Sequence, residues 1–249
     1  MRLAIISDIH EDIVSLRKIL TRIEKLGVDQ LVCLGDISGF STPHYNYHVT
    51  RNAHDCLSVL RERQAIILPG NHDFHASKRI PAESDIFEFP EDWYDLDYRE
   101  KQELTGGEVW MHEMDDLDPL YFQSDLEFLR SLPEYKVLET GSRRILLSHY
   151  VYPNLSGFKK GFYFQESDFL PHFGFMKDRK CELSFTGHAH VRGFYTATIR
   201  RFRHYRYKSL RIEEFPVCIG IMPVTRHKGR RGFCIFDSER SVVSAVRTL

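Results

Sequence analysis

Short apolar runs and amphipathic segments alternate along the N-terminal part of the chain. Three apolar, β-branched runs have the length and composition of strands buried on both faces, and they are residues 2–7, 30–34 and 65–68. Between the first two runs, apolar residues recur at helical spacing over 13–26, and Gly27 stands where a C-terminal helix cap is expected. A second helical region is expected over about 44–63. This alternation predicts parallel strands joined by right-handed helical crossovers.

The middle of the chain is strongly acidic. Residues 82–127 contain sixteen Asp and Glu residues against only Arg99 and Lys101. The periodicity at the end of this stretch predicts a helix that reaches about residue 129 and is stopped by Pro133. We therefore expect an acidic helical segment here.

The remainder of the chain is predicted to be rich in β-structure. A turn at 140–142 is expected to join two strands, of which 144–148 is the second, and an aromatic-rich loop and a strand at 183–186 follow. Over 192–249, β-type runs alternate with turns, which favours an antiparallel meander. Since no repeat, low-complexity linker or clear boundary interrupts the sequence, we expect a single α/β domain over residues 1–249.

Composition narrows the class of protein. A hydrophobic fraction of 42% with 28% charged residues excludes wholesale disorder, and a net charge of −1 argues against a general polyanion-binding protein. The five cysteines are widely spaced without a C-x-x-C pair, which excludes a disulfide framework and a zinc ribbon. The first apolar run is too short for a signal peptide, and no stretch approaches the roughly 20 apolar residues that span a bilayer. We expect a cytoplasmic protein with no membrane partner.

Polar motifs follow five of the predicted strands. They are Asp-Ile-His at 8–10, Gly-Asp at 35–36, Gly-Asn-His-Asp at 70–73, a lone His at 149 and Gly-His-Ala-His at 187–190. Loops at the carboxyl ends of strands are where open α/β sheets bind ligands. We therefore expect all five motifs at one edge of the sheets.

The residue types in these motifs indicate a metal site. Carboxylate oxygen, imidazole nitrogen and amide oxygen suit borderline metals such as Mn, Fe, Co, Ni or Zn. In D-x-H and H-x-H, an extended backbone places both side chains on one face, so each pair can hold one ion or two adjacent ions. No Cys occurs in any motif, which excludes a structural zinc site. Each motif alone is a common turn or surface residue, whereas the ordered set after successive strands favours a metal centre.

The ordered set resembles the calcineurin-like metallophosphoesterase superfamily, whose pattern is D-x-H, G-D, G-N-H-[DE], a lone His and G-H-x-H. The resemblance covers residues 2–192 and is nearest to the bacterial single-domain branch, in which a Leu-Pro-terminated helix precedes the lone His. Here the matching stretches are 129–133 and 146–149. The fold that the resemblance implies is a four-layer αββα sandwich with mixed sheets and a dimetal site at one edge.

The resemblance also implies a role for each motif residue. Two transition-metal ions (Mn, Fe, Zn, Ni or Co) would be held by Asp8, His10, Asp36, Asn71, His149, His188 and His190. In this arrangement Asp8, His10 and His190 hold the first ion. Asn71, His149 and His188 hold the second, and Asp36 bridges both.

Two further residues are implied to be catalytic. His72 is the histidine of Gly-Asn-His-Asp that binds no metal, and Asp73 would orient it. The implied reaction is the hydrolysis of a phosphomonoester or phosphodiester by direct attack of a metal-bridging hydroxide, with His72 assisting the leaving oxygen. No covalent phosphoenzyme is expected.

Two stretches depart from the family pattern. The lone His149 is followed by Tyr150 where the family usually has Gly. The sequence Cys-Ile-Gly-Ile-Met-Pro at 218–223 replaces an Asn-Pro-Gly segment. Both departures leave the ligand positions intact and bear on the shape of the substrate site.

Three classes of function remain open. The favoured class is an enzyme acting on a small phosphate ester or nucleotide. The second is a protein Ser/Thr phosphatase or a nuclease with the same centre, and the third is a non-catalytic metal-binding scaffold, as in a retromer subunit of the superfamily that lacks the catalytic His. Retention of His72 and of all seven ligand positions argues against the scaffold.

A basic stretch leaves nucleic acid as a possible partner. Residues 192–231 contain eleven Lys and Arg residues against Glu213 and Glu214, and 200–208 interleaves cations with aromatic rings. Such a strand could contact phosphates of a single-stranded nucleic acid. An exposed hairpin whose charges are solvated or pair with residues 82–127 is the favoured alternative. The sequence does not define the oligomeric state.

Overall fold

Two six-stranded sheets lie face to face in the computed structural model, which describes residues 1–141, 143–226 and 231–248. In spatial order, the first sheet consists of β11 (Ser209–Arg211), β14 (Val242–Arg247), β13 (Gly232–Asp237), β1 (Arg2–Ile6), β2 (Gln30–Cys33) and β4 (Ile66–Ile67). The second consists of β10 (Arg201–Tyr205), β9 (Phe194–Thr198), β12 (Val217–Ile221), β8 (Leu183–Thr186), β7 (Arg143–Ser148) and β6 (Tyr135–Thr140). A separate pair joins β3 (Phe40–Ser41) and β5 (Asp116–Leu117).

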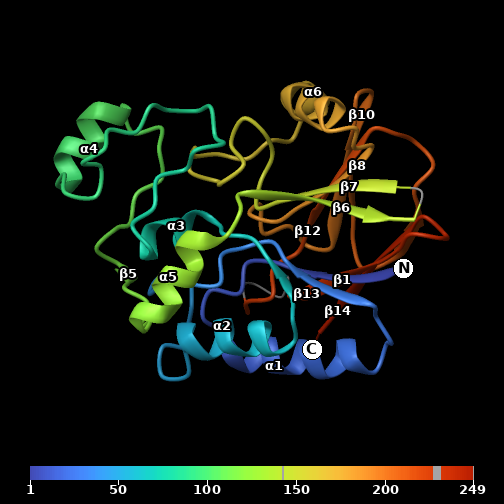
Figure 1. Cartoon of the computed structure of the whole chain (residues 1–249), viewed down its shortest axis with the longest axis horizontal. Coiled ribbons are helices and arrows are strands. Elements are labelled where there is room, and N and C mark those ends of the chain that lie inside the picture. Colours follow the sequence, from blue (N-terminus) through green and yellow to red (C-terminus); the bar gives the residue numbers. More distant parts are fainter. Residues whose placement is uncertain (142, 227–230, 249) are drawn as a thin grey trace.

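Helices cover both outer faces, which gives the expected four-layer αββα order (Figure 1). Helices α1 (Ile13–Glu24) and α2 (Ala53–Glu62) lie against the first sheet, and α6 (Leu170–Asp178), preceded by a 3-10 turn at Glu166–Phe169, lies against the second. Three further helices are α3 (Asn71–Ala76), α4 (Tyr98–Thr105) and α5 (Gln123–Ser131).

The side chains of β1 explain why its sequence is apolar without alternation. Leu3 and Ile5 belong to the cluster between the two sheets. Ala4 and Ile6 belong to the cluster between the first sheet and its helices. Because successive side chains of a strand point to opposite faces, a strand in the middle of this sandwich needs apolar residues at every position.

The parallel pairings place the functional loops. Strand β1 is parallel to β2 and β2 is parallel to β4, as predicted, and β7, β8 and β12 are also parallel neighbours. The carboxyl ends of parallel strands lie at the same edge of a sheet. The loops that carry the sequence motifs therefore leave the sandwich at one edge.

The helix expected over about 44–63 is shorter than predicted. Helix α2 begins at Ala53, because the side chain of Asn52 accepts a hydrogen bond from the Asp55 N–H at 2.8 Å and caps the helix there. Upstream of this cap, Tyr45 and Tyr47 pack against Phe40 in a small cluster of their own.

Two further expectations need correction. Helix α6 lies within the stretch expected to be an aromatic-rich loop. The C-terminal meander is only partly antiparallel, because β12 pairs with β8 in parallel and the chain then crosses to the first sheet. Strands β12 and β13 are almost entirely buried, and such strands fit the middle of a sandwich rather than an exposed meander. The strand pair at the predicted 140–142 turn is present as β6 and β7, with Ser142 outside the described residues.

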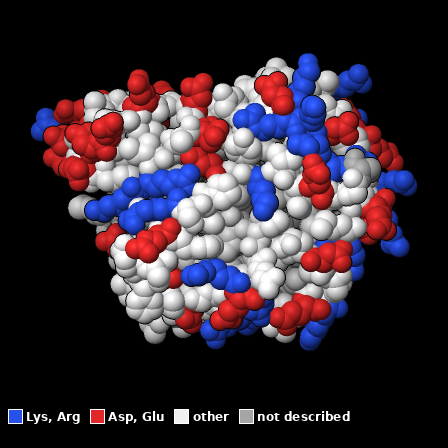
Figure 2. Space-filling view, in the orientation of Figure 1, with Lys and Arg blue, Asp and Glu red and all other residues white. Residues whose placement is uncertain are grey.

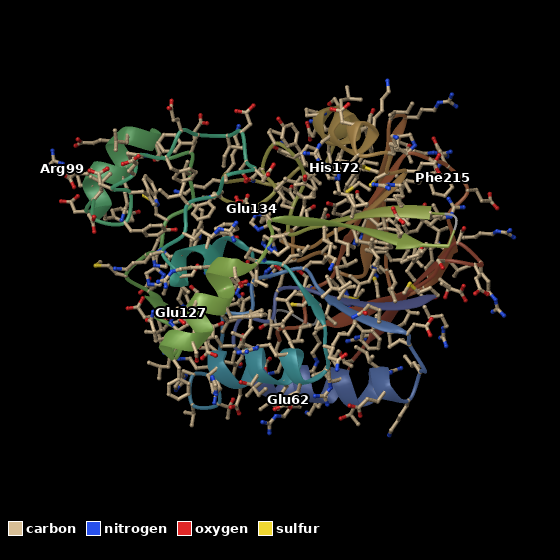
Figure 3. All side chains as sticks on the ribbon, in the orientation of Figure 1. Glu62, Arg99, Glu127, Glu134, His172 and Phe215 are labelled. Atoms are coloured by element: carbon tan, nitrogen blue, oxygen red, sulfur yellow. The ribbon has the colours of Figure 1, made fainter. Side chains whose placement is uncertain are left out.

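The acidic segment 82–127 extends beyond the sheets and carries α4 at its far end (Figure 1). Its start is held by Glu134, whose carboxylate accepts the N–H groups of Ala82 at 2.6 Å and Glu83 at 3.1 Å (Figure 3). Arg79 lies 3.3 Å from the same carboxylate. These contacts fix the start of the acidic segment to the sandwich.

Charge is distributed unevenly over the surface. On the face drawn in Figure 2, acidic side chains gather over α4 and basic side chains gather at the opposite end, near β10. Within the basic stretch, Arg201 pairs with Glu214 of the same stretch at 2.6 Å, and Lys228 and Arg230 lie outside the described residues.

The five cysteines are buried and form no disulfide, as expected. In the described ranges, no helix is both long and apolar enough to cross a membrane.

Candidate metal centre

Unusual backbone conformations accompany the predicted ligands. Five of them have positive φ angles between 45° and 64°, and they are Asp8, His10, Asp36, His188 and His190. Such conformations are uncommon for residues other than glycine and cost free energy, and strain of this kind concentrates at functional sites. The extended backbone expected for D-x-H and H-x-H is therefore wrong, since Asp8, His10, His188 and His190 have left-handed conformations. The loops after β1, β2 and β8 bring the polar side chains together in this strained form instead.

Asp8, His10 and His190 form one group of donor atoms. The His10 and His190 Nε2 atoms lie 3.0 Å apart, and His190 Nε2 lies 3.3 Å from Asp8 Oδ1. The His188 N–H donates to both oxygens of Asp8 at 3.1 Å, which fixes the carboxylate. This is the set that the family resemblance assigned to the first ion.

Asp36, His149 and His188 form a second group. His149 Nε2 lies 3.3 Å from Asp36 Oδ2 and 3.1 Å from His188 Nδ1. The same Asp36 oxygen lies 3.9 Å from His10 Nε2, so this carboxylate stands between the two groups. The structure therefore brings both predicted ligand sets together around Asp36.

The donor atoms fit a cation. His10 Nδ1 donates to the Gly39 carbonyl at 2.7 Å and His149 Nδ1 donates to the Leu34 carbonyl at 2.8 Å, because a carbonyl oxygen can only accept. In the neutral rings this leaves a lone pair on each Nε2, directed at a neighbouring imidazole nitrogen. A proton or a cation must lie between such nitrogens. The buried Asn71 Oδ1 adds an acceptor that has no hydrogen-bond partner in the described part of the chain.

The electrostatics of the site also favour bound positive charge. Burial raises the pKa of Asp8, but the neighbouring His190 outweighs it and lowers this pKa to about 2. Burial acts likewise on Asp36, whose pKa is nevertheless held well below its usual range by His149 and His72. Burial lowers the pKa of His10 to about 4. His149 differs from His10, because burial lowers its pKa but the Asp36 carboxylate outweighs burial and raises it to about 9. A metal ion would replace the proton on this ring, since a ligating imidazole must be neutral and a ligating carboxylate anionic.

His72 and Asp73 lie at the first turn of α3. The His72 N–H donates to Asp36 Oδ1 at 3.0 Å, and a ring nitrogen of His72 lies within 4.8 Å of ligand atoms of His10 and Asp36. Its ring contacts Trp110, with centroids 4.4 Å apart. Burial lowers the pKa of His72 to about 3.

Asp73 is engaged with the loop after β2. Its carboxylate accepts from the Ser38 N–H and hydroxyl, at 3.0 and 2.8 Å, and from the N–H groups of Ile37 and Gly70, each at 3.1 Å. These contacts fix the loop that carries Asp36. A direct effect of Asp73 on His72 remains a prediction.

Two glycines allow the close approach of these loops. A Cβ atom on Gly70 would lie 2.2 Å from Asp36 Oδ1, and one on Gly157 would lie 2.7 Å from His188 Nδ1. Gly157 also has a φ of +83°. Both positions therefore require glycine for the ligands to keep their places.

A cavity of about 450 Å³ lies over the centre and includes residues that the sequence did not indicate. The predicted residues that line it are His10, Asp36, Asn71, His72, His188 and His190. Its walls also contain Tyr45, Trp110 and Phe162. No local pattern marks these three residues, since they come from loops far apart along the chain.

A larger cavity, of about 700 Å³, lies at the opposite ends of β7, β8 and β12. It is lined by Arg143, Lys177 and Phe215, and the last is labelled at the right of Figure 3. None of the motif residues lines it. We therefore place the candidate active site in the smaller cavity, because the donor atoms line that cavity.

Comparisons with known proteins give the family and the fold. Residues 1–192 match the family model for calcineurin-like phosphoesterases. A crystal structure of a metallophosphoesterase from Sphaerobacter thermophilus shares the fold, with a TM-score of 0.67 and 20% identity over 100% of this chain and 88% of that one. A hypothetical protein from Pyrococcus horikoshii has a TM-score of 0.59 and 15% identity over 99% and 87% of the two chains.

A curated relative matches a shorter stretch. It is an uncharacterized protein of Methanocaldococcus jannaschii, 32% identical over 72 residues. The match spans 29% of this chain and only 26% of that relative. Because the family model covers most of the sequence, the chain belongs to the calcineurin-like phosphoesterase family.

Proposed function

We propose that the protein is a metal-dependent phosphoesterase that hydrolyses a small phosphomonoester or phosphodiester. The observation that carries this proposal is the convergence of two carboxylates, four imidazoles and an unpartnered buried amide oxygen around Asp36. Such a set of oxygen and nitrogen donors suits Mn, Fe, Co, Ni or Zn.

We assign two ions to the centre. Asp8, His10 and His190 would hold one, and Asn71, His149 and His188 would hold the other, with Asp36 between them. When bound, a pair of such ions acts as a Lewis acid that activates water and neutralises charge on the phosphoryl oxygens.

The chain's own residues position the ester and assist the leaving oxygen. The backbone contact from His72 to Asp36 holds the His72 ring beside the ligand atoms. A neutral imidazole at this place can donate an N–H to the leaving oxygen as negative charge develops there. Trp110, in contact with the His72 ring, forms the wall on the same side and would exclude water from the leaving group.

The size of the cavity favours a small substrate over a folded protein or a nucleic acid. About 450 Å³ lies within the range of small-molecule sites. Trp110 and Phe162 line this cavity together with the ligands. A phosphate ester of nucleotide size or smaller therefore fits this site best.

The test is His72→Ala, assayed with nitrophenyl and alkyl phosphate esters. We expect the metal content to stay at the wild-type value while kcat/KM falls by about 10²–10⁴, with the larger loss on the alkyl ester, whose poorer leaving group needs more assistance. His204→Ala is the matched control, since His204 is exposed on β10 and does not line the cavity. Equal turnover of wild type and His72→Ala on both esters would contradict the assignment.

A further inference from the structure

One wall of the metal cavity combines aromatic rings with carboxylates. We call the residues Tyr45, Trp110, Glu113, Asp116 and Phe162 the acidic–aromatic wall, and all five line the cavity. Three of them belong to the acidic segment 82–127, whose role the metal centre itself does not explain. The wall lies where the alcohol part of a substrate would be, since Trp110 contacts the His72 ring.

The wall is fixed from two sides. The backbone N–H of Trp110 donates to the Phe158 carbonyl at 2.6 Å, and the backbone N–H of Lys160 donates to the Glu108 carbonyl at 2.8 Å. A few residues further on, β5 pairs with β3 and holds Asp116 opposite Ser41. The carboxylates therefore lie on a backbone anchored at both ends of the 108–117 stretch.

The two carboxylates of the wall have no basic partner among the residues that the structure describes. Asp116 Oδ2 accepts the Glu113 N–H at 3.0 Å, but neither carboxylate forms an ion pair within residues 1–141, 143–226 and 231–248. The residues that line the cavity, among those the structure describes, include no Lys or Arg. Among the described residues that line the cavity, Glu113 and Asp116 are thus the charged side chains beyond the metal ligands.

The aromatic rings of the wall are placed to contact a ligand. Phe162 is 45% exposed, and its ring centroid lies 5.4 Å from that of His188. Trp110 lies against His72, with centroids 4.4 Å apart. Aromatic faces together with carboxylates are the surroundings that bind organic ammonium groups, through cation–π and ionic attraction.

We propose that the acidic–aromatic wall is a subsite for a cationic alcohol, so that the substrate is a phosphate ester of an amino or quaternary ammonium alcohol. The phosphate would lie on the metal centre and the ammonium group against Glu113 and Asp116. This assignment rests on the proposed phosphoesterase function. A second phosphate or a carboxylate on the alcohol would face two unpaired carboxylates and is disfavoured by like-charge repulsion.

The experiment compares phosphocholine with 3-phosphoglycerate on the metal-loaded protein. These esters present a cationic and an anionic alcohol to the same centre, and the readout is the ratio of their kcat/KM values. We expect phosphocholine to be favoured by roughly tenfold or more. In the double variant Glu113→Gln/Asp116→Asn, the ratio should fall to within about threefold of one, because both charges are removed.

Asp115→Asn is the matched control. Asp115 is exposed on the same loop and carries the same charge, but it does not line the cavity. The control should keep the wild-type ratio. Thermal unfolding of each variant verifies that the fold is intact.

Isothermal titration calorimetry also gives the Kd value of each ester, and the ratio of the two Kd values is compared in the same variants. Absence of turnover on every ester would count against the proposed phosphoesterase function, while the ratio of Kd values would still decide on the subsite. A ratio near one in the wild type overturns the proposal. So does a ratio that the double variant leaves unchanged, or one that Asp115→Asn lowers equally.

Discussion

Gly70→Ala is expected to disable the metal centre through a single methyl group. The added Cβ would lie 2.2 Å from Asp36 Oδ1, 2.7 Å from the Asp36 backbone nitrogen and 2.7 Å from His149 Cε1. Non-bonded atoms normally stay about 3.5 Å apart. The Asp36 carboxylate must therefore move by about 1 Å, away from the position in which it accepts the His72 N–H and lies beside His149 Nε2.

The size of the expected loss in activity follows from the position of Asp36 between the two ligand groups. A misplacement of about 1 Å at a reacting centre can cost about 10²-fold in rate. We therefore expect kcat/KM on a nitrophenyl phosphate to fall by about 10² or more, with a lower metal content by inductively coupled plasma mass spectrometry.

Gly174→Ala is the matched control. Gly174 lies in α6, and a Cβ there meets nothing within 4 Å. Ala should raise helix stability by up to about 1 kcal/mol and leave metal content and turnover unchanged. Full metal loading and wild-type turnover in Gly70→Ala would refute the close packing on which the account depends.

Two further predictions concern buried polar groups. Asp73→Asn replaces a carboxylate that accepts backbone N–H groups by an amide, whose own N–H groups can face the Gly70 or Ser38 N–H. The free energy of unfolding in urea should therefore fall by about 1–3 kcal/mol, and metal affinity should fall as well. An unchanged free energy of unfolding and an unchanged metal affinity would contradict this role of Asp73. Burial lowers the pKa of His172 to about 3, and its Nδ1 accepts the Tyr152 N–H at 3.0 Å (Figure 3). Since the unfolded chain binds this proton near pH 6.5 and the folded chain does not, His172 should cost about 1.4 kcal/mol of stability per pH unit as pH falls from about 6.5 toward 3. In His172→Gln the pH dependence of urea unfolding should be weaker by that slope, and an identical slope would contradict the prediction.

The centre was predictable because its ligands are local signals. Each motif follows a strand that is recognisable from its apolar residues. Parallel pairing brings the motifs of each sheet to one edge of that sheet, and the packing of the two sheets brings both sets together. The unbroken apolar run of β1 correctly indicated a strand covered on both faces. Leu3 packs in the cluster between the two sheets, and Ala4 packs in the cluster between the first sheet and its helices. Patterns of this kind reflect burial and can be read directly.

The features that were missed depend on tertiary contacts. Helix α6 has apolar residues around much of its circumference, among them Phe173, Phe175 and Met176, so its sequence shows no clear helical stripe. Tyr45 and Tyr47 resembled part of an amphipathic helix but pack with Phe40 in a loop. Helical spacing alone does not separate these cases.

The wall of the cavity was missed for a different reason. Trp110 and Phe162 are brought to the same site by an isolated bridge between Val109 and Lys159. This contact joins the acidic segment to the loop after β7, and neither stretch carries a local signal for the pairing. In our proposal, substrate selection therefore depends on the part of the fold that the sequence defines least.

The most direct test of the dinuclear assignment is an activity titration. Metal-free protein is titrated with Mn²⁺ while turnover of a nitrophenyl phosphate ester is followed. The account predicts that turnover rises until two equivalents of metal are bound per chain and then stays constant. Saturation at one equivalent, or no turnover at any metal concentration, would contradict it.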